Sequence, residues 1–171
     1  MSLLRGDGAA KDEQQAVGWF SRAAEAGDDV AQVEMAIRYA KGWGVAVDDP
    51  KSVELELAAA AQGNPEAMVY LGSRHEAGRG VTKDLSESVR YFRRAAEGGY
   101  PVGMCYLGDM YAWGSGVAQS NREAYQWYLT AAAAGYQQCE AKLKAIGKKL
   151  SRQERESADR DARAWASRFT K

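Results

Sequence analysis

The feature that most constrains this chain is a pair of glycine series that recur every 36 residues. One series opens a Gly-x-Gly segment in each period, and the other marks a second break. The first series is Gly6, Gly42, Gly78 and Gly114, and the second is Gly27, Gly63, Gly99 and Gly135. A fixed period of about 20–50 residues is typical of stacked supersecondary units. Because two breaks in each period leave room for two helices, the spacing predicts a helical solenoid.

Residues that can cap helices support this division. After each Gly-x-Gly segment comes a side chain that can accept hydrogen bonds from the first turn of a helix, and in three of the four copies a Glu or Gln stands three residues later, as in a capping box. These capping residues are Asp12, Asp48, Asp84 and Ser120. Asp12 is therefore expected to begin a helix over 12–26. The first helices of the repeats are expected at 30–41, 65–77, 102–113 and 137–147.

The period ends after Gly147. Ser151 and Glu154 form another capping box, and Ala162 and Trp165 belong to a narrow apolar stripe that is otherwise surrounded by charged residues. This pattern predicts a terminal helix over 152–168. Such a helix would cover the last repeat and present a polar outer face, as the end of a solenoid requires.

These observations predict an all-α protein in which residues 1–171 form a single solenoid domain. Its expected parts are a truncated N-terminal repeat (1–27), three repeats (28–63, 64–99 and 100–135) and C-terminal capping helices (136–171). The first five residues stand where a helix should be ending, so we expect the chain to be cut from a longer protein.

Charge and hydropathy exclude some classes of partner. The chain carries 23 basic and 23 acidic residues, so its net charge gives no reason to expect a nucleic-acid partner. No stretch approaches about 18 consecutive apolar residues, so no membrane span is predicted. No signal peptide is visible. The cytoplasm, the periplasm and secretion all remain compatible with the sequence.

The residues that most often carry chemistry are few. The two cysteines, Cys105 and Cys139, lack the spacing of a metal site, and Cys139 takes the position that small residues hold in the other repeats. We therefore expect a small buried residue there rather than a disulfide. His75 is the only histidine, and it occupies the slot of Tyr39 and Tyr111, which favours core packing over a ligand role. No catalytic arrangement, metal site or cofactor site is predicted.

Aromatic pairs recur in the second helices. They are Trp19-Phe20, Tyr91-Phe92 and Trp127-Tyr128. In the second repeat the pair is replaced by Leu55-Glu56. We interpret the rings as inter-helix packing. Gly72 and Gly108 recur inside first helices, where each weakens the helix by about 1 kcal/mol relative to alanine. Their repetition predicts that helices approach closely at these points.

The repeated pattern matches a known family. The segment Ala67-x-x-x-Leu71-Gly72-x-x-His75-x-x-Gly78-x-Gly80-Val81-x-x-Asp84, followed by Tyr91-Phe92 and Ala95-Ala96-x-x-Gly99, resembles the Sel-1-like repeat, a relative of the tetratricopeptide repeat. The copy over 103–135 matches about as well, and the copy over 31–63 departs at Ala36 and Glu56. The resemblance implies a right-handed superhelix (an α-solenoid) of antiparallel helix pairs. It also implies a non-enzymatic adaptor that holds partner proteins, in bacterial or eukaryotic settings.

In tetratricopeptide-like stacks the first helices line the concave side. Positions on these helices that are not expected to pack inward predict a face that binds a peptide or helix of a partner protein. They are Val33, Glu34, Ile37, Val69, Tyr70, Ser73, Tyr106, Asp109, Trp113 and Lys142. The aromatic members are expected to anchor the partner and the charged members to select it. The alternative is that some of these rings pack against the neighbouring repeat.

Two other functions remain open. A cysteine-rich bacterial branch of the family that the chain resembles is linked to penicillin binding, which implies a hydrolase of the β-lactam-binding type. Members of that branch carry paired cysteines that bridge the helices of each repeat, and this chain lacks such pairs. The other alternative is a structural fragment of a longer solenoid, whose groove is filled by further repeats.

Overall fold

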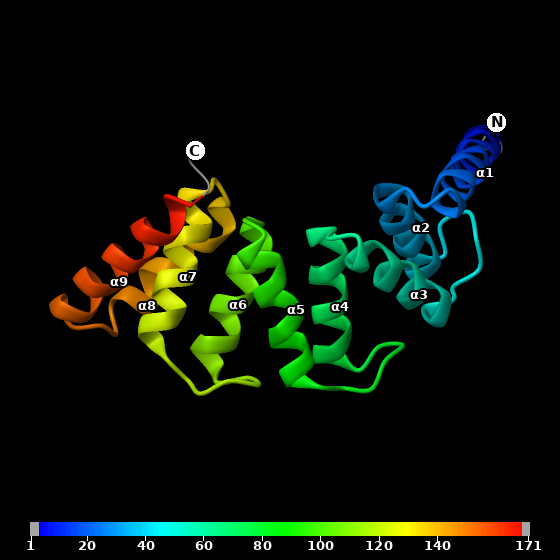
Figure 1. The fold of residues 1–171 in the computed structure, drawn as a ribbon. Coiled ribbons are helices and arrows are strands. Elements are labelled where there is room, and N and C mark those ends of the chain that lie inside the picture. The colour runs from blue at the N-terminus through cyan, green and yellow to red at the C-terminus, as the bar shows by residue number, and fades with distance from the viewer. Residues whose placement is uncertain (1–3, 169–171) are drawn as a thin grey trace.

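The computed structural model describes residues 4–168, with side chains from residue 13 onwards. Every regular element in this part of the chain is a helix (Figure 1). In order they are α1 (Leu4–Glu25), α2 (Asp29–Lys41), α3 (Asp49–Ala61), α4 (Pro65–Ala77), α5 (Leu85–Glu97), α6 (Pro101–Trp113), α7 (Asn121–Ala133), the 3-10 helix η1 (Gln137–Cys139), α8 (Glu140–Gly147) and α9 (Arg152–Ala166). The predicted all-α fold of paired helices is confirmed.

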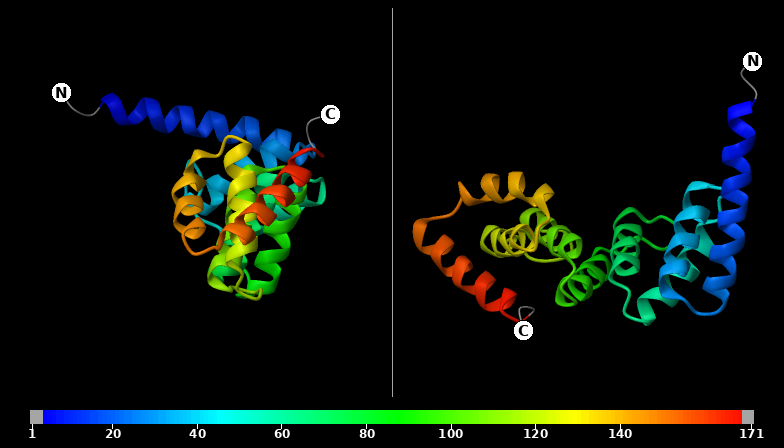
Figure 2. Two further views of the ribbon diagram at one scale, coloured as in Figure 1. Left: turned by 90° about the vertical axis from the view of Figure 1, so that its left-hand side faces the viewer. Right: turned by 90° about the horizontal axis from the view of Figure 1, so that it is seen from above.

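The helices from α2 to α7 form three pairs, each made of two 13-residue helices. The pairs stand side by side in a row, and α9 packs against α7 at its C-terminal end (Figure 1). Seen from above, α4, α6 and α8 lie along one side of the row (Figure 2). We call this side, formed by the first helix of each repeat, the first-helix side.

The helix boundaries follow the capping residues. Asn64 accepts hydrogen bonds from the backbone of Glu66 and Ala67 at the start of α4, and Pro65 occupies the first helical position. Gly78 ends the same helix with φ at 74°, a left-handed conformation that glycine adopts without steric cost. The last first helix is less regular. Tyr136 offers no side-chain cap, and the chain passes through η1 before α8 begins.

The N-terminal segment departs from the prediction. α1 continues without a break from Leu4 to Glu25, so Asp12 does not begin a helix, and Leu4 and Arg5 start a helix rather than ending one. In later repeats the Gly-x-Gly turn packs on the second helix of the preceding repeat. A Cβ at Gly116, for example, would lie 2.3 Å from the Leu85 carbonyl oxygen. The first Gly-x-Gly segment, Gly6 to Gly8, lies inside α1 and forms no turn. Residues 1–3 lie outside the described part.

The two helical glycines are the points of closest helix approach. A Cβ at Gly72 would lie 2.6 Å from the Phe92 ring, and one at Gly108 would lie 2.6 Å from the Tyr128 ring. Both rings are buried in the main core. The predicted close approach is therefore confirmed, and it explains why these helices tolerate glycine.

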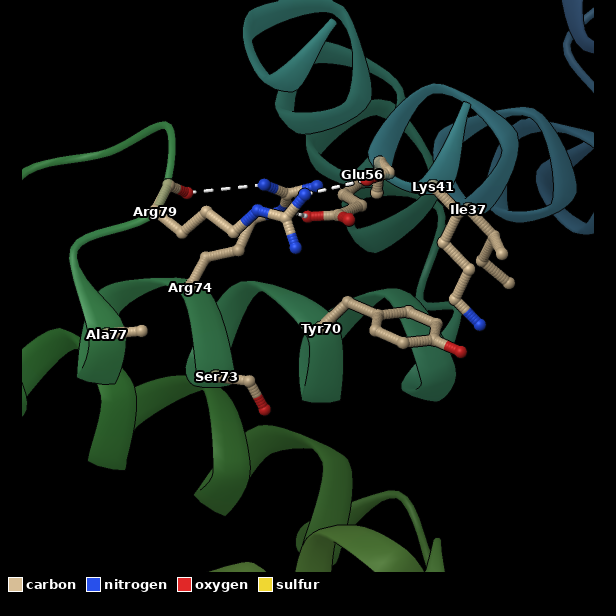
Figure 3. A pocket seen from close by; sticks show the side chains of 9 residues that line it. Ile37, Lys41, Glu56, Tyr70, Ser73, Arg74, Ala77 and Arg79 are labelled. Carbon is tan, nitrogen blue, oxygen red and sulfur yellow. Dashed lines mark hydrogen bonds and ion pairs between the residues drawn. The ribbon is translucent and has the colours of Figure 1, made fainter. Parts of the chain in front are cut away.

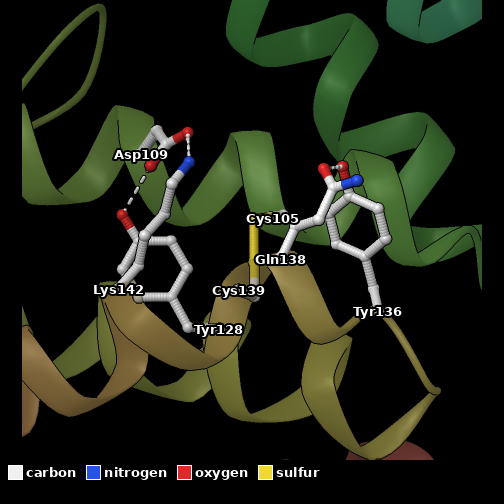
Figure 4. Close-up of a disulfide and its surroundings, with 7 residues drawn as sticks. All are labelled: Cys105, Asp109, Tyr128, Tyr136, Gln138, Cys139 and Lys142. Carbon is white, nitrogen blue, oxygen red and sulfur yellow. Dashed lines mark hydrogen bonds and ion pairs between the residues drawn. A yellow bond between two sulfur atoms is a disulfide. The ribbon is translucent and has the colours of Figure 1, made fainter.

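The prediction for the cysteines is wrong. Cys139 is buried, as expected, but it forms a disulfide with Cys105, with 6.1 Å between the Cα atoms. The bridge joins α6 to η1 (Figure 4). Neighbouring first helices lie side by side, so residues almost one period apart face each other. The position of a cysteine within its own repeat does not contain that information.

The C-terminal helix closes the row as predicted. Ser151 and Glu154 form a reciprocal capping box at its start. Trp165 meets Trp127 of α7 edge-on, with 5.3 Å between the ring centroids. None of the described helices is both long enough and apolar enough to cross a membrane.

Candidate functional site

The first-helix side carries a pocket of about 310 Å³ between α2 and α4. Its walls are mostly apolar, and its lining residues are Ile37, Ala40, Lys41, Glu56, Tyr70, Ser73, Arg74, Ala77 and Arg79. Figure 3 shows the Tyr70 ring extending from α4 towards the side chains of Ile37 and Lys41 on α2. We call this the first pocket. It lies where two neighbouring repeats meet.

A buried ion pair forms the floor of the first pocket. Nε of Arg74 donates to Glu56 Oε2 at 2.7 Å, and both side chains are almost inaccessible to solvent. The remaining guanidinium nitrogens donate to Asp49, to the hydroxyl of Ser52 and to the carbonyl of Arg79. The charge of Arg74 is therefore fully partnered within the protein (Figure 3).

The pKa values of the two carboxylates in this network, Glu56 and Asp49, shift in opposite directions. Burial raises the pKa of Glu56 above its ordinary value, although the hydrogen bond from Arg74 acts in the other direction. Asp49 lies closer to solvent, and hydrogen bonds from Arg74 and Arg79 lower its pKa. Burial, and then the neighbouring Glu66 carboxylate, raise the pKa of Tyr70 to about 12, and its hydroxyl donates to Glu66 Oε1 at 3.4 Å.

In the first pocket, Glu56 stands where the next two repeats have an aromatic ring. The equivalent residues in the next two repeats are Phe92 and Tyr128, which lie against helical glycines. In the repeat that contains Glu56, Ala36 takes the position of the helical glycine. Its Cβ occupies the space that a ring would need. The two departures from the repeat pattern, Ala36 and Glu56, are thus linked, because the alanine leaves no space for a ring. Together they leave room above the ion pair.

A second pocket, of about 200 Å³, lies between α6 and α8. Its lining residues are Asp109, Ala112, Trp113, Tyr128, Lys142, Ala145, Ile146 and Lys149. Each of these stands two 36-residue periods after a residue of the first pocket, from Ile37 and Asp109 to Ala77 and Lys149. The two pockets are therefore the same structural site, two repeats apart.

A polar network borders the second pocket. Asp109 is buried, accepting a hydrogen bond from the Tyr128 hydroxyl at 2.7 Å and an ion pair from Lys142 Nζ at 2.6 Å (Figure 4). Burial, and then the hydrogen bond to Asp109, raise the pKa of the Tyr128 phenol. A smaller hollow of about 190 Å³, which includes Cys105 and Tyr136 in its lining, adjoins on the other side of Lys142.

The equivalent site between α4 and α6 is filled by two stacked rings. Phe92 and Tyr106 lie with 5.0 Å between their centroids and 10° between their planes. Tyr106 nevertheless keeps 36% of its surface exposed. One of the two rings is replaced in each open pocket: Glu56 takes the place of Phe92 in the first, and Lys142 that of Tyr106 in the second.

Seven of the ten predicted site residues lie at or between the two pockets. Ile37, Tyr70 and Ser73 line the first pocket. Asp109, Trp113 and Lys142 line the second pocket. Tyr106 lies between them, as described above.

The remaining predicted residues lie off this surface or at its edge. Val33 and Val69 are buried in the core, so they present no surface to a partner. Glu34 is half-buried and lines neither pocket. Periodicity along the first helix also places Lys41 on this face, but it does not assign Lys149 to the site. The equivalence of Lys149 to Ala77, two repeats earlier, was the signal that could have found it.

His75 has a structural role. Its ring stacks on Tyr91 at 5.7 Å, and its Nδ1 lies 3.2 Å from the carbonyl oxygen of Thr82 in the following loop. In the part of the chain with described side chains, no three His, Cys, Asp or Glu residues are placed to hold a metal ion.

A model of the Sel1 repeat matches residues 1–28, 29–64, 65–100 and 101–136. The chain belongs to the Sel1 repeat family. A solved Sel1 repeat protein from Oxalobacter formigenes is 37% identical and has a TM-score of 0.67, with 74% of this chain and 95% of that chain covered. Comparison of the sequence with curated proteins found no match.

A second solved structure shares the fold. It is c5321, a protective antigen present in uropathogenic Escherichia coli strains that displays an SLR fold, with 24% identity and a TM-score of 0.68. The alignment covers 88% of this chain but 40% of that one. At this identity the likeness concerns the fold. The Sel1 repeat scaffold is thus shared with proteins of bacteria.

Proposed function

We propose that this Sel1 repeat chain is a non-enzymatic interaction module that holds a peptide or helix of a partner protein on its first-helix side. The observation that carries the proposal is the pair of equivalent pockets described above. Each combines apolar walls with an aromatic side chain and a lysine, the composition expected of an anchor site.

The exposure of the lining side chains supports this function. Trp113 keeps 65% of its surface exposed at the edge of the second pocket, although it is among the largest apolar residues in the chain. Tyr70 is half-buried and flanks the first pocket. Large aromatic residues held in such positions by rigid helices lose little conformational entropy on binding.

Selection from a displayed peptide library tests the proposal. Peptides would be enriched on the wild-type protein and then measured against a Tyr70→Ala/Trp113→Ala variant, whose far-UV circular dichroism should match the wild type. We expect the selected peptides to lose most of their affinity for the variant. Trp19→Ala provides the matched control, because Trp19 is an exposed tryptophan of α1 that lines neither pocket. Equal binding to all three proteins would refute the assignment of this face.

A further inference from the structure

The three equivalent sites between neighbouring first helices hold different pairs of side chains at the positions of Phe92 and Tyr106. Two rings, Phe92 and Tyr106, close the middle site. One ring remains in each of the others, Tyr70 beside Glu56 and Tyr128 beside Lys142, and both of these are open. The first-helix side therefore offers two apolar openings that are separated by one closed repeat.

Each opening also keeps one cation without a carboxylate partner. The other cations that line the pockets are paired with Glu56, Asp49 or Asp109. Lys41 lies over the Trp43 ring, but within the described residues no ion pair joins it or Lys149 to an acidic group. Both lysines are exposed. The two openings thus carry an excess of positive charge, although the whole chain is neutral.

The separation of the openings sets the length of a ligand that fills both. Packed helices lie about 10 Å apart, so two steps along the first helices amount to roughly 20 Å. An extended chain spans that distance with about six residues, at about 3.3 Å per residue. Residues six apart in a strand point to the same side, so both can face the protein. A helix would need about 14 residues, or two heptads, to reach both openings from one face, so an extended segment reaches them with fewer than half as many residues.

We propose that the first-helix side binds an extended acidic segment of a partner protein through two large apolar side chains about six residues apart. Each apolar side chain fills one pocket, and an Asp or Glu beside it pairs with Lys41 or Lys149. The ligand needs no acidic residue opposite the closed middle repeat. Glu76 stands there, at the position that Ala40 and Ala112 hold in the two openings. This inference rests on the proposed function and specifies its ligand.

Synthetic peptides test the spacing and the charge. The probe is a fluorescently labelled peptide with two Leu residues six positions apart, an acidic residue on each side of both, and Ser and Gly elsewhere. One comparison peptide has the Leu residues five positions apart, and another has Lys in place of every acidic residue. Fluorescence polarisation should show about tenfold or greater loss of affinity for either comparison peptide.

Charge reversal on the protein provides the reciprocal test. In a Lys41→Glu/Lys149→Glu variant both changes are on exposed side chains, so the fold should be kept. We expect this variant to lose the acidic probe and to bind the Lys-containing peptide instead. Trp19→Ala should bind every peptide as the wild type does.

Two further variants close one pocket each by copying the middle site. Ala36→Gly/Glu56→Phe/Arg74→Met supplies the residues found at Gly72, Phe92 and Met110, and Asp109→Ser/Lys142→Tyr supplies those at Ser73 and Tyr106. Each variant should weaken binding of the probe to the level of a peptide with a single Leu. Circular dichroism establishes that each remains helical.

The outcomes separate the two proposals. Binding that depends on spacing, on charge and on both pockets supports this inference. If the probe does not bind, or binds regardless of charge or spacing, while library peptides still depend on Tyr70 and Trp113, the inference is wrong and the proposed function stands. If neither the probe nor any library peptide depends on this face, both are wrong.

Discussion

The Cβ position of Gly72 lies 2.6 Å from the Phe92 ring, so the ring keeps its place in the core only because residue 72 has no side chain. The same relation holds between Gly108 and Tyr128. Where the glycine is absent, at Ala36, the ring is absent too. At the first pocket the glycine and the ring of the repeat signature are therefore lost together.

This relation predicts opposite effects for two glycine substitutions. Gly72→Ala should lower the free energy of unfolding by about 1–3 kcal/mol, because the added methyl group displaces a fully buried ring. Gly18→Ala in α1 should raise it by up to about 1 kcal/mol, because nothing lies within 4 Å of that Cβ and alanine favours the helix. Urea denaturation measures both. A stabilising effect of Gly72→Ala would show that the ring can move without cost.

The ion pair beneath the first pocket predicts that the stability cost of replacing Arg74 depends on whether Glu56 is present. Arg74→Met alone should cost about 3–5 kcal/mol of stability, because it leaves the Glu56 carboxylate buried without a partner. The triple variant Ala36→Gly/Glu56→Phe/Arg74→Met should recover most of that loss, since it replaces the pair with the apolar packing of the next repeat. Midpoints of urea unfolding compare the two. A triple variant as unstable as the single one would contradict the equivalence of the repeats.

The pH dependence of stability should report on Asp49. Hydrogen bonds from Arg74 and Arg79 lower its pKa in the folded state, so its stabilising contribution is complete above the unfolded pKa of about 3.9 and is lost as the pH falls through the lower folded value. The stability difference between the wild type and Asp49→Asn should therefore shrink as the pH is lowered from 5 towards 3. A difference that stays constant over this range would mean that the carboxylate does not contribute through its charge.

The disulfide predicts sensitivity to reductants. Cys105 and Cys139 are 34 residues apart, and closing a loop of that length in the unfolded chain is worth about 3–4 kcal/mol. Dithiothreitol should lower the unfolding midpoint of the wild type towards that of a Cys105→Ala/Cys139→Ala variant. The variant itself should not respond to the reductant, which controls for effects of the reductant on other groups.

The periodic part of the fold was accessible from the sequence. Capping residues and glycines placed α4 at the residues where it is found, because each of these signals acts locally on the backbone. The error over residues 4–12 has a non-local origin. Gly6 looks like the glycines of later turns, which pack on the second helix of the preceding repeat, but it lies inside α1.

The candidate site was accessible only in part. Exposed rings such as Trp113 could be assigned to the first-helix side from helical periodicity. The fate of Val33 and Val69 depends on how far the next repeat covers them, and single-helix periodicity does not contain that information. The disulfide between Cys105 and Cys139 likewise depends on contacts between repeats. The sequence signal for the first pocket was present in Ala36 and Glu56, but it looked like weak agreement with the repeat.

The alternation of ring pairs along the row has a consequence for how such proteins diverge. Equivalent positions recur in every repeat. Replacing a ring with a carboxylate or an amine therefore leaves a pocket between two neighbouring repeats, and the reverse replacement fills it. On the binding mode proposed above, two homologues with superimposable backbones would differ in the number of residues between the anchors they accept. Ligand length would then evolve independently of the length of the solenoid.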